Sequence, residues 1–160
     1  MVRRILTSLF VLVCLQASAQ ENVKTYMTEY GDTIMYFNGE RTDAQGFYSV
    51  EIRYPNGERY IGQFKDDKKN GKGKFFYASG DIYEGEWVNS YKEGKGIYYY
   101  KKGDRYEGEY KEDVKDGKGI YYYENGDRFE GYWKEGSKDG PGTFYFANGT
   151  TYSDVWPTIR

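Results

Sequence analysis

Carboxylates in regular array are the first feature of this sequence that could support chemistry. Glu84, Glu86, Glu107 and Glu109 recur at matching positions of two similar segments, and a pair of carboxylates can hydrolyse glycosides. The 160 residues include no histidine, however, and a single cysteine, Cys14. The four glutamates also alternate with large apolar residues, as on the solvated face of a strand. We therefore predict no catalytic residue and no enzyme.

Residues 66–71, DDKKNG, are the best candidate for a metal site, since they offer oxygen ligands near a glycine. The lysines and the spacing do not match an EF-hand loop. We expect no metal and no cofactor, and we interpret the segment as a solvated loop. Its lysines, which lie among acidic and polar residues, are Lys65, Lys68, Lys69, Lys72 and Lys74.

The N-terminus has the layout of a secretory signal peptide over residues 1–19. Two arginines precede an apolar run from Ile5 to Leu15, and Ala17-Ser18-Ala19 forms a cleavage motif. The run is too short to span a bilayer, which takes roughly 20 residues. A lipoprotein signal acylated at Cys14 is the alternative, and the bulky Val13 disfavours it. We expect an exported protein that is periplasmic, on the cell surface or secreted.

Cleavage would leave a chain without cysteine, held by packing alone. Without Arg3 and Arg4 the 23 basic side chains become 21, against 25 acidic ones, a formal charge of −4. This sign argues against nucleic acids and anionic membrane surfaces as partners, because both attract clustered Lys and Arg.

The chain repeats itself every 23 residues from 60 to 156. Four gapless copies begin at Tyr60, Tyr83, Tyr106 and Phe129, and residues 152–156 begin a further copy. Residues 37–59 resemble a degenerate copy, residues 20–36 form an arm that we expect to be an irregular cap, and residues 157–160 are a tail. In the terminal half-repeat Asp154 replaces the repeat glycine, which suits a protected sheet edge.

Each copy predicts a β-hairpin. Residues 106–110, YEGEY, alternate large and charged residues, residues 119–123 favour a strand, and residues 125–127, NGD, form a turn. Because one hairpin is marginal alone, the copies should stack. The fold class is therefore all-β, an elongated, twisted, single antiparallel sheet of about ten strands.

A three-residue loop at 125–127 would place Tyr121 opposite Gly131, so that rings face glycines and fill the space that these leave. The core predicted on the first strands consists of Tyr60, Phe64, Tyr83, Trp87, Tyr106, Tyr110, Phe129 and Trp133. Its second-strand members are Phe75, Tyr98, Tyr121 and Phe144. The repeat glycines are Gly62, Gly73, Gly85, Gly96, Gly108, Gly119, Gly131 and Gly142.

The segments YEGEW at 83–87 and YEGEY at 106–110, with the Gly-Lys-Gly and Gly-Asp that follow them, resemble MORN repeats, named for membrane occupation and recognition. The resemblance covers residues 60–156 well and 37–59 loosely. It implies stacked hairpins that serve as scaffolds, dimerisation surfaces or lipid contacts, and no enzyme. Choline-binding repeats are a weaker match, since their period is shorter and their Gly-Trp start is absent.

Four aromatic residues share one second-strand position: Phe76, Tyr99, Tyr122 and Tyr145. Strand alternation points them away from the core, where many MORN repeats have a polar residue. They could stiffen the sheet or bind a partner, and exposed aromatic patches often mark interaction sites. We expect a scaffold that binds a protein partner or itself through this strip. The alternative is a module that binds a polysaccharide or a lipid of the cell envelope.

Overall fold

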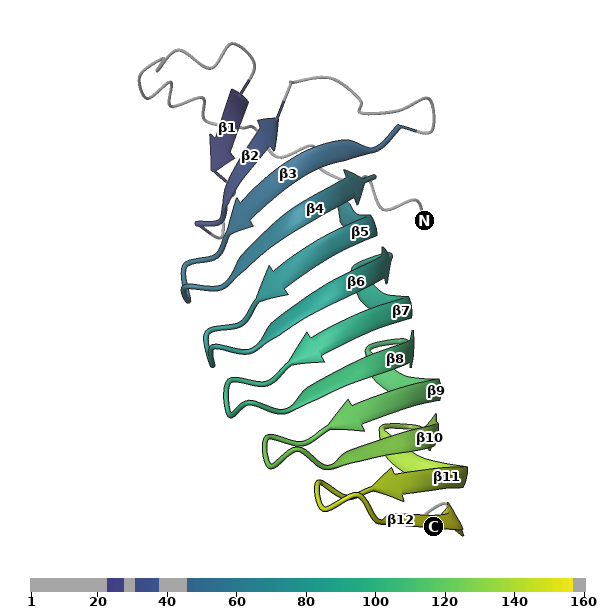
Figure 1. Cartoon of the computed structure of the whole chain (residues 1–160). Helices are drawn as coiled ribbons and strands as arrows, with labels where there is room; N and C mark the ends of the chain where they lie inside the picture. The colour runs from purple at the N-terminus through teal and green to yellow at the C-terminus, as the bar shows by residue number, and fades with distance from the viewer. Residues whose placement is uncertain (1–22, 28–30, 38–45, 157–160) are drawn as a thin grey trace.

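In the computed structural model the chain forms a single antiparallel sheet of 12 strands, which neighbour one another in sequence order (Figure 1). The structure describes residues 23–27, 31–37 and 46–156, and none of these residues is helical. They accordingly contain no helix with the length and hydropathy of a membrane span. The predicted all-β fold of stacked hairpins is confirmed, with 12 strands in place of about ten.

The strands are β1 (Val23–Met27), β2 (Thr33–Phe37), β3 (Tyr48–Arg53), β4 (Arg59–Lys65), β5 (Lys68–Phe76), β6 (Ile82–Val88), β7 (Tyr91–Tyr99), β8 (Arg105–Lys111), β9 (Val114–Tyr122), β10 (Arg128–Lys134), β11 (Ser137–Tyr145) and β12 (Thr151–Trp156).

Two kinds of connection alternate along the repeats. Within a repeat, a two-residue turn joins the strands, as at Glu112 and Asp113, where φ is 47° and 73°. Two positive φ values are typical of a type I′ hairpin turn. Between repeats the strands are joined by five residues, as at 123–127. There the N–H of Tyr123 donates to the carbonyl of Asp127, and the N–H of Gly126 donates to the carbonyl of Tyr123.

The register across this five-residue loop differs from the expected one by two residues. Tyr121 pairs with Phe129 and not with Gly131, which pairs with Gly119. The predicted loop at 125–127 is wrong because it centres on Gly126, whereas Gly126 ends the turn with a φ of 89°. A left-handed residue after a type I turn is common in such hairpins. Because the shift is even, the side chains keep the faces assigned to them.

Paired glycines make room for a ring of their own hairpin. Gly108 pairs with Gly119, and a Cβ on Gly119 would lie 2.6 Å from Cζ of Tyr106. The Tyr106 hydroxyl donates to the carbonyl of Glu109 at 3.2 Å. The pairing then shifts between Gly108 and Tyr110, which is a β-bulge. Equivalent pairs are Gly62 with Gly73, Gly85 with Gly96, and Gly131 with Gly142.

The core lies on the face that carries these rings. The hairpin ends with the two-residue turns curl back behind the sheet (Figure 1), and edge-to-face contacts join the rings, as between Tyr83 and Trp87 at 5.1 Å. Tyr98, Tyr121 and Phe144 of the second strands are half-buried and pack against this core. The buried rings are Tyr60, Phe64, Phe75, Tyr83, Trp87, Tyr106, Tyr110, Phe129 and Trp133.

Carboxylates connect successive five-residue loops, which explains the recurring Gly-Asp. Each aspartate accepts the backbone N–H of a residue 20 positions further on, in the next loop. These links help to stack the hairpins. They join Asp81 to Lys101 at 2.8 Å, Asp104 to Glu124 at 3.0 Å, and Asp127 to Ala147 at 2.8 Å.

The sequence predicts an irregular N-terminal arm, but this prediction is wrong, because the arm contains the strands β1 and β2. The register of β2 with β3 differs by three residues from that within a full repeat, since Thr33 rather than Tyr36 pairs with Arg53. Phe37 therefore ends a strand, whereas its counterpart Tyr60 lies near the start of one. Residues 1–22, with the predicted signal peptide and Cys14, lie outside the described residues, as do 28–30, 38–45 and 157–160.

The last strand, β12, pairs with β11 on one side only. Asp154 lies opposite Gly142. Its carboxylate accepts the N–H of Val155 at 2.8 Å and the hydroxyl of Tyr152 at 2.5 Å. The Asp154 carboxylate thus accepts a backbone N–H of the edge strand. This is consistent with the prediction that Asp154 protects the sheet edge, which remains a prediction.

Candidate interaction surface

The predicted aromatic strip lies in one cross-strand row on the face opposite the core, called the outer face below. Arginines occupy neighbouring positions of this row. Arg105, for example, pairs with both Tyr99 and Tyr122. In order across the sheet the row consists of Arg53, Arg59, Phe76, Ile82, Tyr99, Arg105, Tyr122, Arg128, Tyr145 and Thr151.

Arginine guanidinium groups cover three of the four rings, and all four rings are half-buried. Each such contact contributes about 0.5–1 kcal/mol at an exposed site. Phe76, Tyr122 and Tyr145 of the strip are therefore each stacked against an arginine. The distances from the arginine Cζ to the ring centre are 4.3 Å for Arg59 and Phe76, 4.2 Å for Arg105 and Tyr122, and 3.9 Å for Arg128 and Tyr145.

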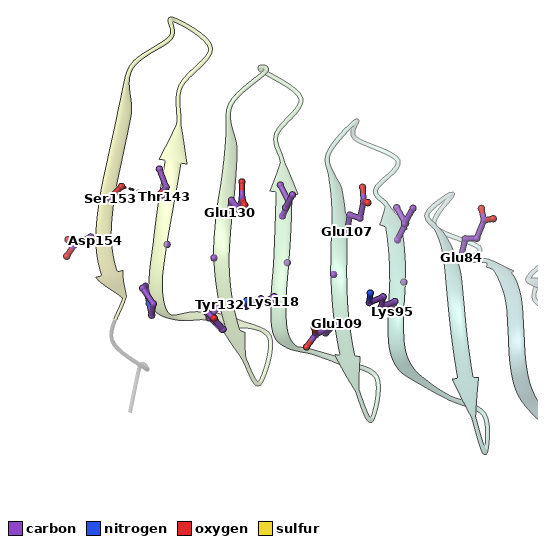
Figure 2. Close-up of a pocket in the computed structure, with 18 residues that line it drawn as sticks. Glu84, Lys95, Glu107, Glu109, Lys118, Glu130, Tyr132, Thr143, Ser153 and Asp154 are labelled. Atoms are coloured by element: carbon purple, nitrogen blue, oxygen red, sulfur yellow. Dashed lines mark hydrogen bonds between the residues drawn. The ribbon is translucent and has the colours of Figure 1, made fainter.

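An open groove of about 970 Å³ crosses the outer face beside the strip (Figure 2). Its floor is the backbone of the paired glycines, which lie between two rows of side chains in Figure 2. One wall contains Glu107 and Ile120, and the other contains Glu109 and Lys118. On the five central strands, β7 to β11, the two wall residues of a strand are two positions apart, on either side of a glycine.

Charged and apolar side chains alternate along the first wall from Glu84 to Glu130, and the second wall begins with charges of alternating sign. Glu84 pairs with Lys74 at 2.7 Å, and Glu107 lies 3.6 Å from Arg105. Glu84, Glu107 and Glu109, which were considered above as possible catalytic carboxylates, thus lie on the walls of an open groove. In order, the first wall has Glu84, Ile97, Glu107, Ile120, Glu130, Thr143 and Ser153, and the second has Lys95, Glu109, Lys118, Tyr132 and Pro141.

A continuous ladder of rings runs along the core face, and sequence reasoning identified only its second-strand members, Phe75, Tyr98, Tyr121 and Phe144, but not the loop rings between them. Neighbouring ring centres are 4.6 to 5.8 Å apart. The signal is present in the sequence, because an aromatic residue recurs every 23 residues at the first loop position. The ladder consists of Tyr54, Phe75, Tyr77, Tyr98, Tyr100, Tyr121, Tyr123, Phe144 and Phe146.

Two tyrosines of this ladder donate their hydroxyls to the loop aspartates. Tyr98 reaches Asp81 at 3.1 Å, and Tyr121 reaches Asp104 at 2.5 Å. Burial and these carboxylates raise the pKa of both tyrosines. Burial alone would raise the pKa of Asp104, but hydrogen bonds from Lys102 and Tyr121 hold it below its ordinary value. The aspartates therefore join the ladder to the loops as charged groups.

A lysine of each repeat lies over the core rings, whereas the sequence predicts a solvated loop around Lys69. That interpretation is wrong, because residues 68–76 form β5 and the Nζ of Lys69 lies 4.4 Å from the ring centre of Phe75. Lys115 lies 4.8 Å from both Tyr106 and Trp133. Burial lowers the pKa of Lys115 to about 8. The four equivalent lysines are Lys69, Lys92, Lys115 and Lys138.

Within the described part of the chain, no group of three acidic, histidine or cysteine side chains could hold a metal ion. Asp66 and Asp67, the acidic residues of the segment considered as a metal site, form the two-residue turn between β4 and β5, and both have positive φ. Residues 66–67 therefore form a hairpin turn like those of the other repeats, and the rest of the segment lies in β5.

Comparison with known proteins gives one clear match. The family model described as MORN repeat matches residues 60–82, 83–105, 106–128 and 129–151. No curated protein matches the chain.

Solved structures with a similar shape include the TCP domain of SAS-4 (dCPAP) of Drosophila melanogaster, in complex with a proline-rich motif of Ana2 (dSTIL). That chain is 14% identical, the match covers 91% of this chain and 85% of that one, and the TM-score is 0.47. The wild-type TCP10 domain of Danio rerio CPAP is 15% identical, with 88% and 87% covered and a TM-score of 0.39. Likeness at this level says nothing about the function of the chain.

Proposed function

Because the chain belongs to the MORN repeat family, we propose that it is a non-enzymatic, exported scaffold that binds a protein partner through the outer face of its sheet. The observation that carries this proposal is the outer face itself. A row of tyrosines and arginines lies beside an open groove, and both repeat at constant spacing. Tyrosine and arginine are enriched at protein interfaces, where they supply much of the binding energy.

A polysaccharide partner has less support. Sugars stack on open ring faces, whereas arginines cover one face of Phe76, Tyr122 and Tyr145. A repeated surface of mixed charge is better suited to the polar groups of a protein.

Export rests on the signal peptide expected at residues 1–19. N-terminal sequencing of the protein from its own host should begin at Gln20. A mature protein that retains Met1, or that is recovered only from the cytosol, would contradict this part of the proposal.

The binding proposal is tested by capture of surface proteins on the immobilised mature chain. The double variant Tyr99→Ser, Tyr122→Ser should lose a partner that the wild type retains. Its fold should survive, because both rings lie outside the core and the arginine contact that Tyr122 loses contributes about 0.5–1 kcal/mol. The matched control is Tyr91→Ser, Tyr152→Ser, which removes two tyrosines that lie off the strip and are each 53% exposed. Equal capture by all three proteins would refute the strip as a binding site.

A second comparison tests the assignment of faces. Tyr98→Ser and Tyr121→Ser remove rings of the core-face ladder and their hydrogen bonds to aspartate. Loss of a packed ring costs about 3–5 kcal/mol, so these variants should unfold at much lower temperature than the strip variants.

A further inference from the structure

We propose that the groove on the outer face binds a single chain in the polyproline II conformation, with a basic side chain at every third residue. This inference rests on the proposed function, since it specifies the kind of protein segment that the surface recognises. Three properties of the groove support it: its spacing, its width and the order of its charges.

The spacing of the groove matches the polyproline II helix. Neighbouring strands are about 4.8 Å apart, so equivalent residues of successive repeats are separated by about 9.6 Å. A polyproline II helix has three residues per turn and rises about 3.1 Å per residue, which repeats its side chains every 9.3 Å or so. A β-strand returns to the same face after about 6.8 Å, and an α-helix completes a turn in about 5.4 Å. Only the first conformation presents one side chain to each repeat.

The width of the groove admits one extended chain. Its walls are side chains two positions apart on the same strand, as with Glu107 and Glu109, and such residues lie about 6.8 Å apart. An α-helix with its side chains is about 10–12 Å across. A helix would therefore rest on top of the walls, while an extended backbone can approach the glycine floor between them.

The charges of the groove complement a basic, proline-rich segment. Glu84, Glu107 and Glu130 stand at the same position of three repeats, one for each turn of the ligand. Lys74 and Arg105 already contact Glu84 and Glu107, so a ligand cation there would share the carboxylate with them or replace them. Ile97 and Ile120 lie between them and offer apolar surface to proline rings. On the other wall, the lysines can donate to the carbonyl groups, which a polyproline II helix leaves without internal partners.

Fluorescence anisotropy with synthetic peptides tests the proposal on the mature chain. The probe is a labelled peptide of Pro-Pro-Lys repeats, long enough at about nine residues or more to follow the groove. The comparison peptide has the same composition, with lysines two and four residues apart. We expect the regular peptide to bind about tenfold more tightly, a difference of about 1.4 kcal/mol. Equal affinities would overturn the proposal, because they would show attraction of charge without recognition of spacing.

The double variant Glu107→Gln, Glu130→Gln locates the binding. It should weaken binding of the regular peptide about tenfold. Its matched control is Glu124→Gln, Glu135→Gln, which makes the same change of charge at exposed positions outside the groove and should leave the affinity unchanged. Equal loss in both variants would overturn the proposal.

The outcome is independent of the capture experiment. If the strip variant loses its partner but the regular peptide does not bind, the scaffold function stands and this inference falls. If capture is unaffected by the strip variant, the strip fails as a binding site, and the peptide titration still decides the groove. Binding of a glycan in place of the peptide would also overturn the inference.

Discussion

For the replacement of Gly119 by alanine, strand propensity and the structure predict opposite changes in the free energy of unfolding. Glycine in a strand is less favourable than alanine by about 0.5–1 kcal/mol, so propensity alone predicts a gain in stability. In the structure the new Cβ would lie 2.6 Å from Cζ of Tyr106. That ring is 0% exposed, and its hydroxyl is held by the carbonyl of Glu109.

The expected result is a loss of about 2 kcal/mol in the free energy of unfolding. Overpacking a rigid site costs about 1–3 kcal/mol, and displacing the Tyr106 hydroxyl adds about 1 kcal/mol for its hydrogen bond. The propensity gain offsets only part of this sum. Urea denaturation of the mature chain, followed by tryptophan fluorescence, measures the difference.

A double-mutant cycle identifies the cause. Tyr106→Leu shortens the side chain that the alanine would contact, so Gly119→Ala should cost at least about 1 kcal/mol less in that background. Additive effects would mean that the glycine does not act by making room for the ring. A neutral or stabilising Gly119→Ala would refute the reasoning directly.

Three further changes should alter stability in predictable directions. Tyr110→Trp should raise the free energy of unfolding by about 1 kcal/mol in urea denaturation. The buried Tyr110 hydroxyl has no hydrogen-bond partner among the described residues, whereas tryptophans at the equivalent position of two other repeats donate to glycine carbonyls. An unchanged free energy of unfolding would contradict this. Glu112→Asn should raise the melting temperature, because Glu112 has a φ of 47° and asparagine tolerates this conformation better; a decrease would count against the strain. Stability should rise between about pH 7 and 9, because burial lowers the pKa of Lys115 to about 8 from 10.5, so the unfolded chain binds more protons in this interval. Lys115→Met should flatten the rise, and an unchanged slope in thermal melts would exclude Lys115 as its source.

The periodicity of the sequence predicts the hairpins because strand alternation is a local property. Residues 106–110 alternate so regularly that the pattern alone assigns Tyr106 and Tyr110 to the core, where both side chains are buried. The loop register is harder, because Gly126 can adopt its positive φ at more than one turn position, and only the hydrogen bonds of the folded loop decide which. The face assignment is unaffected by this error because the shift is even.

Features that depend on the curl of the sheet cannot be predicted from local sequence patterns. Lys69 lies in a segment that looks solvated, and its position over the rings results from the bend of the hairpin end across the core. The groove likewise requires the glycines of all repeats to lie in one row, which follows from the register. Lysine recurs visibly every 23 residues, yet the sequence alone does not distinguish a repeated surface charge from a repeated contact with rings.

The hydrogen bonds from loop to loop all point in the same direction along the stack of repeats, and they recur once in each repeat. Each of Asp81, Asp104 and Asp127 accepts a backbone N–H of the next loop. A duplicated repeat would therefore bond to the aspartate of the loop before it, and its own aspartate would bond to the loop after it. Whole repeats can therefore be gained or lost without redesign of their neighbours, and each would change the length of the groove by about 9.6 Å. A lineage could thus adjust the length of the groove by unequal recombination alone.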